Sequence, residues 1–189
     1  STTLAFEPAS TSTNVNSTLS LDIVLDPGTG STANQVSFVK LSIGFDPAKF
    51  TTLVTDSLAP NTSSLNNLTS ILEDPLYESG KASISLSIGA DPTKVVTKKT
   101  KIAILKLKAL AATADNPSSI TFNGATNSVT QVLSIASADQ TSENVLSTTT
   151  PAVITISGQA TTTPAPTSKP TGTTPTPPPA GTTTTPPPS

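Results

Sequence analysis

The chain has 189 residues, a formal net charge of −2 and no cysteine, histidine, methionine or tryptophan. These absences exclude disulfides, thiolate or imidazole metal ligands and the general base that most often works near neutral pH. The small net charge gives no electrostatic footprint for nucleic acid, and no apolar run is long enough to span a bilayer. We therefore expect no cofactor, no nucleic-acid partner and no membrane span in this chain.

Alternation of apolar and polar residues predicts a series of strands that each have one buried face. In the first third of the chain this pattern covers residues 4–6, 17–26 and 39–45. The third stretch is the clearest, and Asp46-Pro47 ends it because proline fixes φ and has no N–H to donate. Phe50 is then expected to turn back onto the core.

The alternation changes phase just before the third stretch. Val36 and Phe38 fall on the opposite face from Val39. Either a β-bulge near Phe38 inserts one residue, or the strand is apolar on both faces at this point. We favour the bulge.

Residues 55–80 show no sustained period and are rich in Ser, Thr and Asn, with Pro60 and Pro75 among them. After a brief strand at residues 51–54, we interpret this segment as a long surface loop with at most one helical turn at residues 70–74. Long ordered loops often carry function, which makes the segment a candidate for partner binding.

Alternation returns in the second half of the chain, and no stretch is convincingly helical. The eight or nine short strands and their Asp-Pro and Gly turns predict an all-β protein, an antiparallel β-sandwich. The later strands are residues 81–88, 101–110, 120–122, 129–135 and 152–156. One shared core is expected, and it includes Leu21, Ile23, Val39, Leu41, Ile43, Phe45, Ile84, Leu86, Leu105 and Leu107.

The end of the chain has a different composition from the rest. Residues 159–189 consist almost wholly of Pro, Thr, Ser, Ala and Gly, which cannot bury enough apolar area to offset chain entropy. We therefore predict a sandwich over residues 1–158 and a separate Pro/Thr-rich tail over residues 159–189. Such a tail favours extended polyproline II at about 3.1 Å per residue, so it has a reach on the order of 90 Å.

The pattern of strand ends resembles the cohesin family, the β-sandwich modules best known from cellulosome scaffoldins. The resemblance is carried by residues 4–8, 19–26, 39–47, 80–84, 104–109, 120–122 and 153–156. It implies a jelly-roll-like sandwich of nine strands, related to carbohydrate-binding modules, with a sheet face that binds a dockerin in cellulosomes. The chain departs from that family in its polar segment at residues 55–80 and in having one module without an attached enzyme or dockerin.

Two groups of carboxylates are candidate sites. Asp26, Asp46 and Asp91 each precede a proline, and turn formation explains them better than a calcium site does. Residues 73–78 hold the acidic cluster Glu73, Asp74 and Glu78, and two carboxylates are the machinery of glycoside hydrolysis. Because the chain has no histidine and no aromatic-lined cleft is expected, we predict that it is not an enzyme.

Lysines are concentrated between residues 94 and 108, where a solvated sheet face that discourages edge pairing explains them better than an anionic partner does. The candidate partner surface consists of Lys106, Lys108, Leu76 and Tyr77. Glycosylation is a further expectation, because three Asn-x-Ser/Thr motifs accompany the threonine-rich tail. The candidate acceptors are Asn16, Asn61, Asn67, Thr173, Thr174, Thr182 and Thr183.

Together these features predict a non-catalytic interaction or assembly module that is extracellular, either secreted or on a cell surface. The small polar start at residues 1–3 is typical of a secreted protein whose leader has been removed. The expected partner is a protein or a second copy of the chain, and the more specific hypothesis is a surface filament or sheath whose subunits contact one another through the tail. The alternative is a carbohydrate-binding module, which normally requires exposed aromatic rings.

Overall fold

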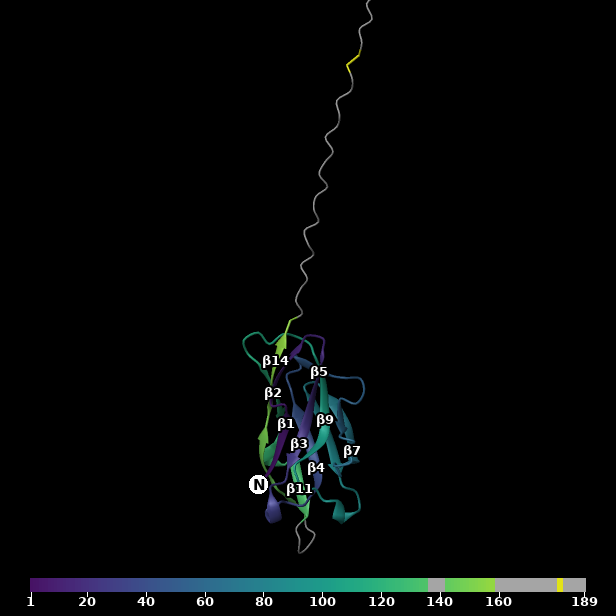
Figure 1. The fold of residues 1–189 in the computed structure, drawn as a ribbon, viewed down its shortest axis with the longest axis vertical. Coiled ribbons are helices and arrows are strands. Elements are labelled where there is room, and N and C mark those ends of the chain that lie inside the picture. The colour runs from purple at the N-terminus through teal and green to yellow at the C-terminus, as the bar shows by residue number, and fades with distance from the viewer. Residues whose placement is uncertain (136–141, 159–179, 182–189) are drawn as a thin grey trace, which may run out of the picture. The chain divides into compact units, whose positions relative to one another are not determined.

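The computed structural model describes residues 1–135, 142–158 and 180–181. Within these ranges the chain forms fourteen strands in two sheets, with three short 3₁₀ helices (Figure 1). The strands are β1 (Thr2–Glu7), β2 (Ser10–Asn14), β3 (Thr18–Asp26), β4 (Val36–Gly44), β5 (Phe50–Thr52), β6 (Leu58–Pro60), β7 (Ser70–Glu78), β8 (Lys81–Ser87), β9 (Thr100–Ala109), β10 (Ser118–Phe122), β11 (Gln131–Ile135), β12 (Ser142–Asn144), β13 (Leu146–Thr150) and β14 (Ala152–Ser157). The helices are η1 (Gly30–Thr32), η2 (Pro92–Lys94) and η3 (Ala125–Asn127), and none is long and apolar enough to cross a membrane.

The two sheets have six and eight strands. In the first sheet the order is β13-β1-β3-β9-β5, and β6 also pairs with β9. In the second sheet the order is β12-β11-β4-β10-β14-β2, while β8 pairs with β4 and β7 pairs with β8. The predicted all-β sandwich is confirmed, and the described part contains more strands than the eight or nine expected.

The N-terminal and C-terminal strands of the domain account for part of the higher count. β1 belongs to the first sheet and β2 to the second, and Pro8 lies between them; β13 and β14 are divided in the same way at Pro151. β1 pairs in parallel with β13, and β2 pairs in parallel with β14. The N-terminal segment and the C-terminal segment of the domain therefore each pass from the first sheet to the second.

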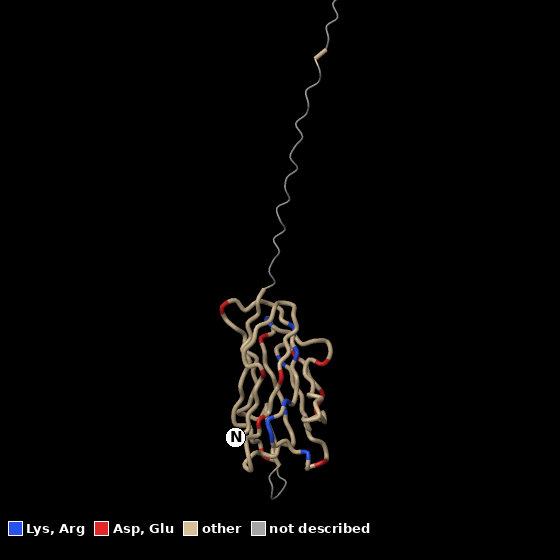
Figure 2. The backbone as a smooth tube through the Cα atoms, viewed as in Figure 1, with Lys and Arg blue, Asp and Glu red and all other residues tan. Residues whose placement is uncertain are grey.

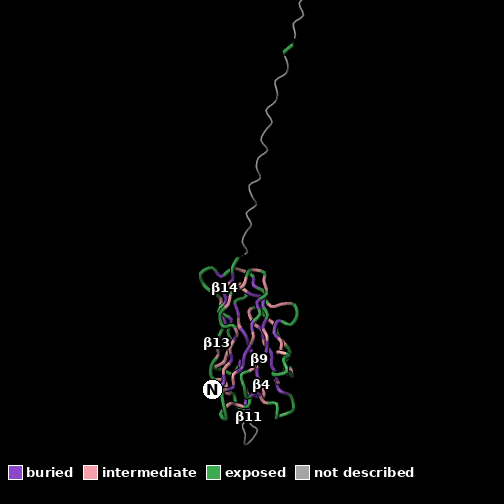
Figure 3. Tube along the Cα trace, viewed as in Figure 1, coloured by how far each residue is buried: buried purple, intermediate pink, exposed green. Residues whose placement is uncertain are grey.

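A single apolar core lies between the sheets, and the buried residues follow the central strands in Figure 3. All ten residues predicted to share the core belong to it. Phe50 also folds back into this core, as expected. Near one end, Phe6 of β1 stacks on Phe122 of β10 with ring centroids 4.2 Å apart, which joins the first sheet to the second.

The β-bulge predicted near Phe38 is confirmed. β11 pairs Leu133 with Phe38 and the next residue, Ser134, with Val36, so Ser37 of β4 is the extra residue. Both Val36 and Val39 are fully buried in the core as a result. The inserted residue thus reconciles two apolar residues that a regular alternation places on opposite faces.

The interpretation of residues 55–80 as a loop was wrong. β6 and β7 lie in this segment, and the nine residues of β7 pair with β8 as an edge strand of the second sheet. Residues 70–74, considered for a helical turn, are part of β7. The alternation is obscured because β7 is largely exposed and its register with β8 shifts twice, so no continuous apolar face marks it in the sequence.

Candidate functional site

The outer face of β7, β8, β4 and β11 carries polar, charged and apolar side chains, and it is named here the β4 face. Since Val39, Leu41 and Ile43 of β4 point into the core, the residues between them point outward. The strand register then places side chains in three rows across the face. They are Ser70, Ser87, Phe38 and Leu133 in the first row, Glu73, Ser85, Lys40 and Gln131 in the second, and Leu76, Ser83 and Ser42 in the third.

A polar cluster occupies the middle row. Lys40 Nζ lies 3.0 Å from Glu73 Oε2, and the hydroxyl of Ser85 donates to the same carboxylate. These two partners lower the pKa of Glu73, first through the Ser85 hydrogen bond and then through Lys40. Glu73 is therefore ionised at neutral pH, and its charge is matched by the lysine beside it.

The end of the β4 face nearest η2 is apolar and hollowed. The hollow has a volume of about 540 Å³. Its apolar lining includes Phe38, Leu72, Ile88, Pro92 and Ile135, and the hydroxyls of four serines lie around it. Leu72 is 61% exposed, and Leu76 further along β7 is 57% exposed. Leu72 and the hollow together form an apolar surface, and covering that surface with another apolar surface is favourable.

The opposite end of the β4 face is closed by residues 123–130. The hydroxyl of Thr130 accepts from the Ser42 N–H and donates to the Ser42 carbonyl, each at 3.1 Å. The Asn123 N–H also donates to that carbonyl, at 2.7 Å. Ser42 is consequently buried although it points away from the core.

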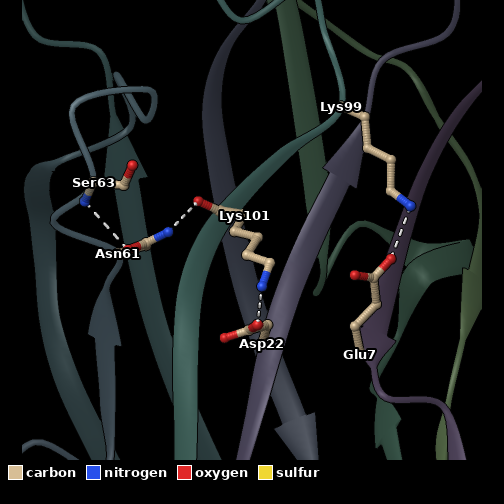
Figure 4. Close-up of polar contacts among 6 residues, drawn as sticks. All are labelled: Glu7, Asp22, Asn61, Ser63, Lys99 and Lys101. Carbon is tan, nitrogen blue, oxygen red and sulfur yellow. Dashed lines mark hydrogen bonds and ion pairs between the residues drawn. The ribbon is translucent and has the colours of Figure 1, made fainter.

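The outer face of the first sheet is charged and carries two ion pairs. Lys99 pairs with Glu7 at 2.8 Å and Lys101 pairs with Asp22 at 2.5 Å, which links β1 and β3 to the β9 segment (Figure 4). The carboxylates raise the pKa of both lysines, mainly through these hydrogen bonds. Over the whole described domain, acidic and basic residues are interspersed (Figure 2).

The four residues of the candidate partner surface lie on different sheets. Lys106 and Lys108 are exposed on β9 of the first sheet, whereas Leu76 and Tyr77 lie on β7 of the second. Leu76 belongs to the β4 face. Tyr77 packs against the core, and its hydroxyl accepts from the Leu58 N–H at 2.9 Å and donates to the Leu58 carbonyl at 3.3 Å. The structure thus groups Leu76 with Lys40 and Glu73 instead of with the two lysines.

The three asparagine acceptors differ in their surroundings. Asn61 Nδ2 donates to the Lys101 carbonyl at 3.0 Å, as Figure 4 shows, and Asn67 Nδ2 donates to the Lys94 carbonyl at 3.1 Å. Asn16 is exposed in the turn between β2 and β3, with φ of 67°. The threonine acceptors Thr173, Thr174, Thr182 and Thr183 lie outside the described residues.

Of the six candidate carboxylates, three form turns and two form surface ion pairs. Asp26, Asp46 and Asp91 each accept from the backbone N–H two residues later, at 2.8–3.0 Å, which is the turn geometry predicted for them. Glu73 pairs with Lys40 and Glu78 with Lys81. Among the described residues, no group of three acidic side chains is arranged to hold a metal ion.

Most of the β4 face was not expected from the sequence. Lys40 and Glu73 are 33 residues apart, and only the pairing of both strands with β8 brings them together. Because residues 55–80 show no strand period, no sequence signal connects β7 to β4. The signal that was present is Phe38, whose phase break marks an apolar side chain outside the core.

Three solved structures resemble the sandwich over most of the chain. The seventh ScaB type I cohesin from Pseudobacteroides cellulosolvens has a TM-score of 0.62 and 10% identity, covering 84% of this chain and 94% of that chain. CaCohA2 from Clostridium acetobutylicum has a TM-score of 0.59 and 17% identity, covering 84% and 92%. The third ScaC cohesin from Acetivibrio cellulolyticus has a TM-score of 0.59 and 18% identity, covering 82% and 99%. The sandwich has the cohesin fold.

The cohesin fold confirms, at the level of architecture, the resemblance carried by the strand ends. No protein-family model matches the sequence, and no curated protein matches it. The structural neighbours share only 10–18% of their residues with this chain, so the likeness concerns the fold. Function has to be argued from the faces of this particular cohesin-fold domain.

Proposed function

We propose that this domain is a non-catalytic module that binds a protein partner through the β4 face. The observation that carries the proposal is the apolar hollow beside an ion pair that is already satisfied. A partner covers Phe38 and Leu72 without stranding an unpaired charge, because Lys40 and Glu73 neutralise each other. The structure of the ScaC cohesin from Acetivibrio cellulolyticus contains a ScaB dockerin, so a neighbour with this fold binds a protein.

The partner's chemistry follows from the shape of the β4 face. An apolar side chain that enters the hollow of about 540 Å³ contacts Phe38 and Ile88. The surrounding serine hydroxyls accept hydrogen bonds from the partner's backbone N–H groups or donate to its carbonyls. Opposite the middle row, a neutral polar surface is favoured, since an added charge competes with the Lys40–Glu73 pair. The partner is therefore a protein surface with an apolar protrusion and a polar, uncharged surround.

The test compares two charge substitutions in the full chain. Leu72→Lys places a charge beside the hollow. Ser20→Lys places the same charge at an exposed position of β3, in the first sheet. Immobilised wild-type and variant proteins are exposed to surface extracts of the source cells, and the retained proteins are identified and then assayed in purified form. Binding that is lost with Leu72→Lys and kept with Ser20→Lys supports the proposal, and equal binding by both variants contradicts it.

We further propose that the domain works outside the cell, as part of a surface assembly, with residues 159–189 as the connector between copies. Support comes from composition, since a segment with ten prolines has preset φ angles and loses less entropy on docking than an ordinary coil. The boundary between sandwich and tail near Gly158 also stays a prediction. Glycans on the asparagine or tail threonine acceptors belong to the same proposal.

The alternative, carbohydrate binding, has less support from the described residues. Phe6, Phe45, Phe50 and Phe122 are buried in the core, and Tyr77 is engaged with Leu58. Phe38 is the one partly exposed phenylalanine in the described part. Screening the full chain on a glycan array decides between the two functions, since sugar binding abolished by Phe38→Ala favours the alternative.

A further inference from the structure

One edge of the second sheet is open. β2 pairs with β14 on one side, and no described strand pairs with its other side. The Ala9 carbonyl accepts from the Val153 N–H, and the Val15 N–H donates to the Ser157 carbonyl. The N–H and C=O of one residue in a strand point to the same side, and successive residues alternate, so the residues between these two positions divide into two sets. The N–H and C=O groups of Ser10, Ser12 and Asn14 point away from β14, toward the open side.

Two of the terminal strands of this sheet, β2 and β7, are built differently, and they lie at opposite sides of the sandwich in Figure 1. β7 carries Pro75 and three carboxylates, and its register shifts twice, which are features that discourage pairing with another chain. β2 has neither charge nor proline within its five residues, and its pairing with β14 is regular. The open edge of β2 therefore lacks the protection that β7 has.

We propose that β2 pairs in antiparallel fashion with β2 of a second copy, about a twofold axis at Ser12. This register aligns all three outward-facing residues, with Ser12 opposite Ser12 and Ser10 opposite Asn14. The strand is uncharged, so the self-pairing brings no like charges together. Thr11 and Thr13 are half-buried on the inner side of β2, beside Ile154 and Ile156. In the proposed register, Thr11 of each copy lies opposite Thr13 of the other.

The expected self-association is weak and depends on concentration. Five residues provide one short ladder, and the Asn14 carbonyl already accepts from the Ser17 N–H at 3.0 Å. The buried area of such a contact is below that of a stable dimer interface. This inference does not rest on the proposed function. β2 is not one of the strands of the β4 face, and the two surfaces are tested by different substitutions.

Cross-linking of single-cysteine variants tests the register, since the chain has no other cysteine. In Ser12→Cys the two Cα atoms lie about 5.5 Å apart in the proposed dimer, within range of a short thiol cross-linker. In Ser10→Cys the equivalent atoms are about 14 Å apart along the strands, so the same reagent gives no dimer. A mixture of Ser10→Cys and Asn14→Cys cross-links again, because these residues face each other. Cross-linking of all three samples to the same extent overturns the register.

Proline substitutions test the edge itself, with sedimentation of the full chain up to about 1 mM as the measurement. Ser12→Pro removes an N–H that points to the open side, so the monomer keeps its β14 ladder while each dimer loses two hydrogen bonds. The dimer dissociation constant is expected to rise at least about tenfold. Thr11→Pro, whose N–H points to β14, lowers the unfolding midpoint instead.

Three results overturn the proposal. The first is a wild-type chain that stays monomeric over the whole concentration range. The second is association that Ser12→Pro leaves unchanged. The third is association that is lost on deletion of residues 159–189 and kept in Ser12→Pro, which assigns the contact to the tail. Loss of partner binding in Leu72→Lys has no bearing on these outcomes, so the two proposals fail separately.

Discussion

β4 and β7 are both nine residues long, and both pair with β8 in the same sheet. β4 lies inside the sheet, where it pairs with β8, β10 and β11, and it contributes Val36, Val39, Leu41 and Ile43 to the core. β7 lies at the margin, with Leu72 and Leu76 exposed and with Pro75 in its interior. The central strand carries a clear alternation because one face is fully buried, whereas the edge strand is shaped by the need to avoid other edges.

This difference separates stability from binding. Side chains of β4 that point inward hold the sandwich together, while the outward residues of β7 and β4 are the ones available to a partner. Substitutions in the two strands are therefore expected to differ in both size and kind. An outward-facing β7 residue that behaves like a core residue breaks the contrast.

The largest expected effect is at Phe45, which follows β4 directly and is 8% exposed. Phe45→Ala is expected to lower the free energy of unfolding by about 3–5 kcal/mol through lost burial and a residual cavity. Urea denaturation of the full chain measures it. A change below about 1 kcal/mol shows that the ring does not have the packing role assigned to it.

The next largest effect is at Tyr77, the residue of β7 that points inward. Tyr77→Phe keeps the ring but leaves the buried Leu58 N–H without its partner, at a cost of about 1–3 kcal/mol. Leu76→Ala, one residue earlier and exposed, is the matched control and is expected to cost less than about 0.5 kcal/mol. Equal costs for the two variants indicate that the inward and outward sides of β7 have been confused.

A smaller effect is expected at Glu73, whose side chain is 58% exposed. Its pKa lies below the ordinary value of 4.5, so its contribution to stability is present above that value and is lost as the pH falls through the lowered pKa. Glu73→Gln is expected to change stability at neutral pH by less than about 1 kcal/mol. Denaturation at about pH 7 and about pH 3 should show a smaller pH-dependent loss in the variant than in the wild type. An unchanged pH dependence contradicts this role of Glu73.

The smallest expected effect on stability comes from deletion of residues 159–189. Every described core residue lies upstream of Gly158, so the melting temperature is expected to change by less than about 2 °C. If the tail connects copies, the same deletion abolishes any assembly that native material shows by electron microscopy. A truncated protein that assembles normally leaves the tail as a spacer.

The sequence alone determined which strands carry the core. Alternation with one buried face depends on local spacing, so residues such as Leu41, Ile84 and Leu105 were assigned to the core from pattern alone. The bulge near Phe38 was also legible, because a phase break between two apolar residues has few structural explanations. The Asp-Pro turns were also predictable from the sequence, because their hydrogen bonds join residues only two positions apart.

Only the tertiary structure decided where the edges and the outer faces are. β2 pairs with β14, which is distant in sequence. β7 forms a hairpin with β8, which follows it directly, but Glu73 meets Lys40 only because β8 also pairs with the distant β4. Because β2 and β7 have no fully buried face, no period in the sequence marks them. The core was thus predictable because burial imposes a period, and the outer faces were not because exposure imposes none.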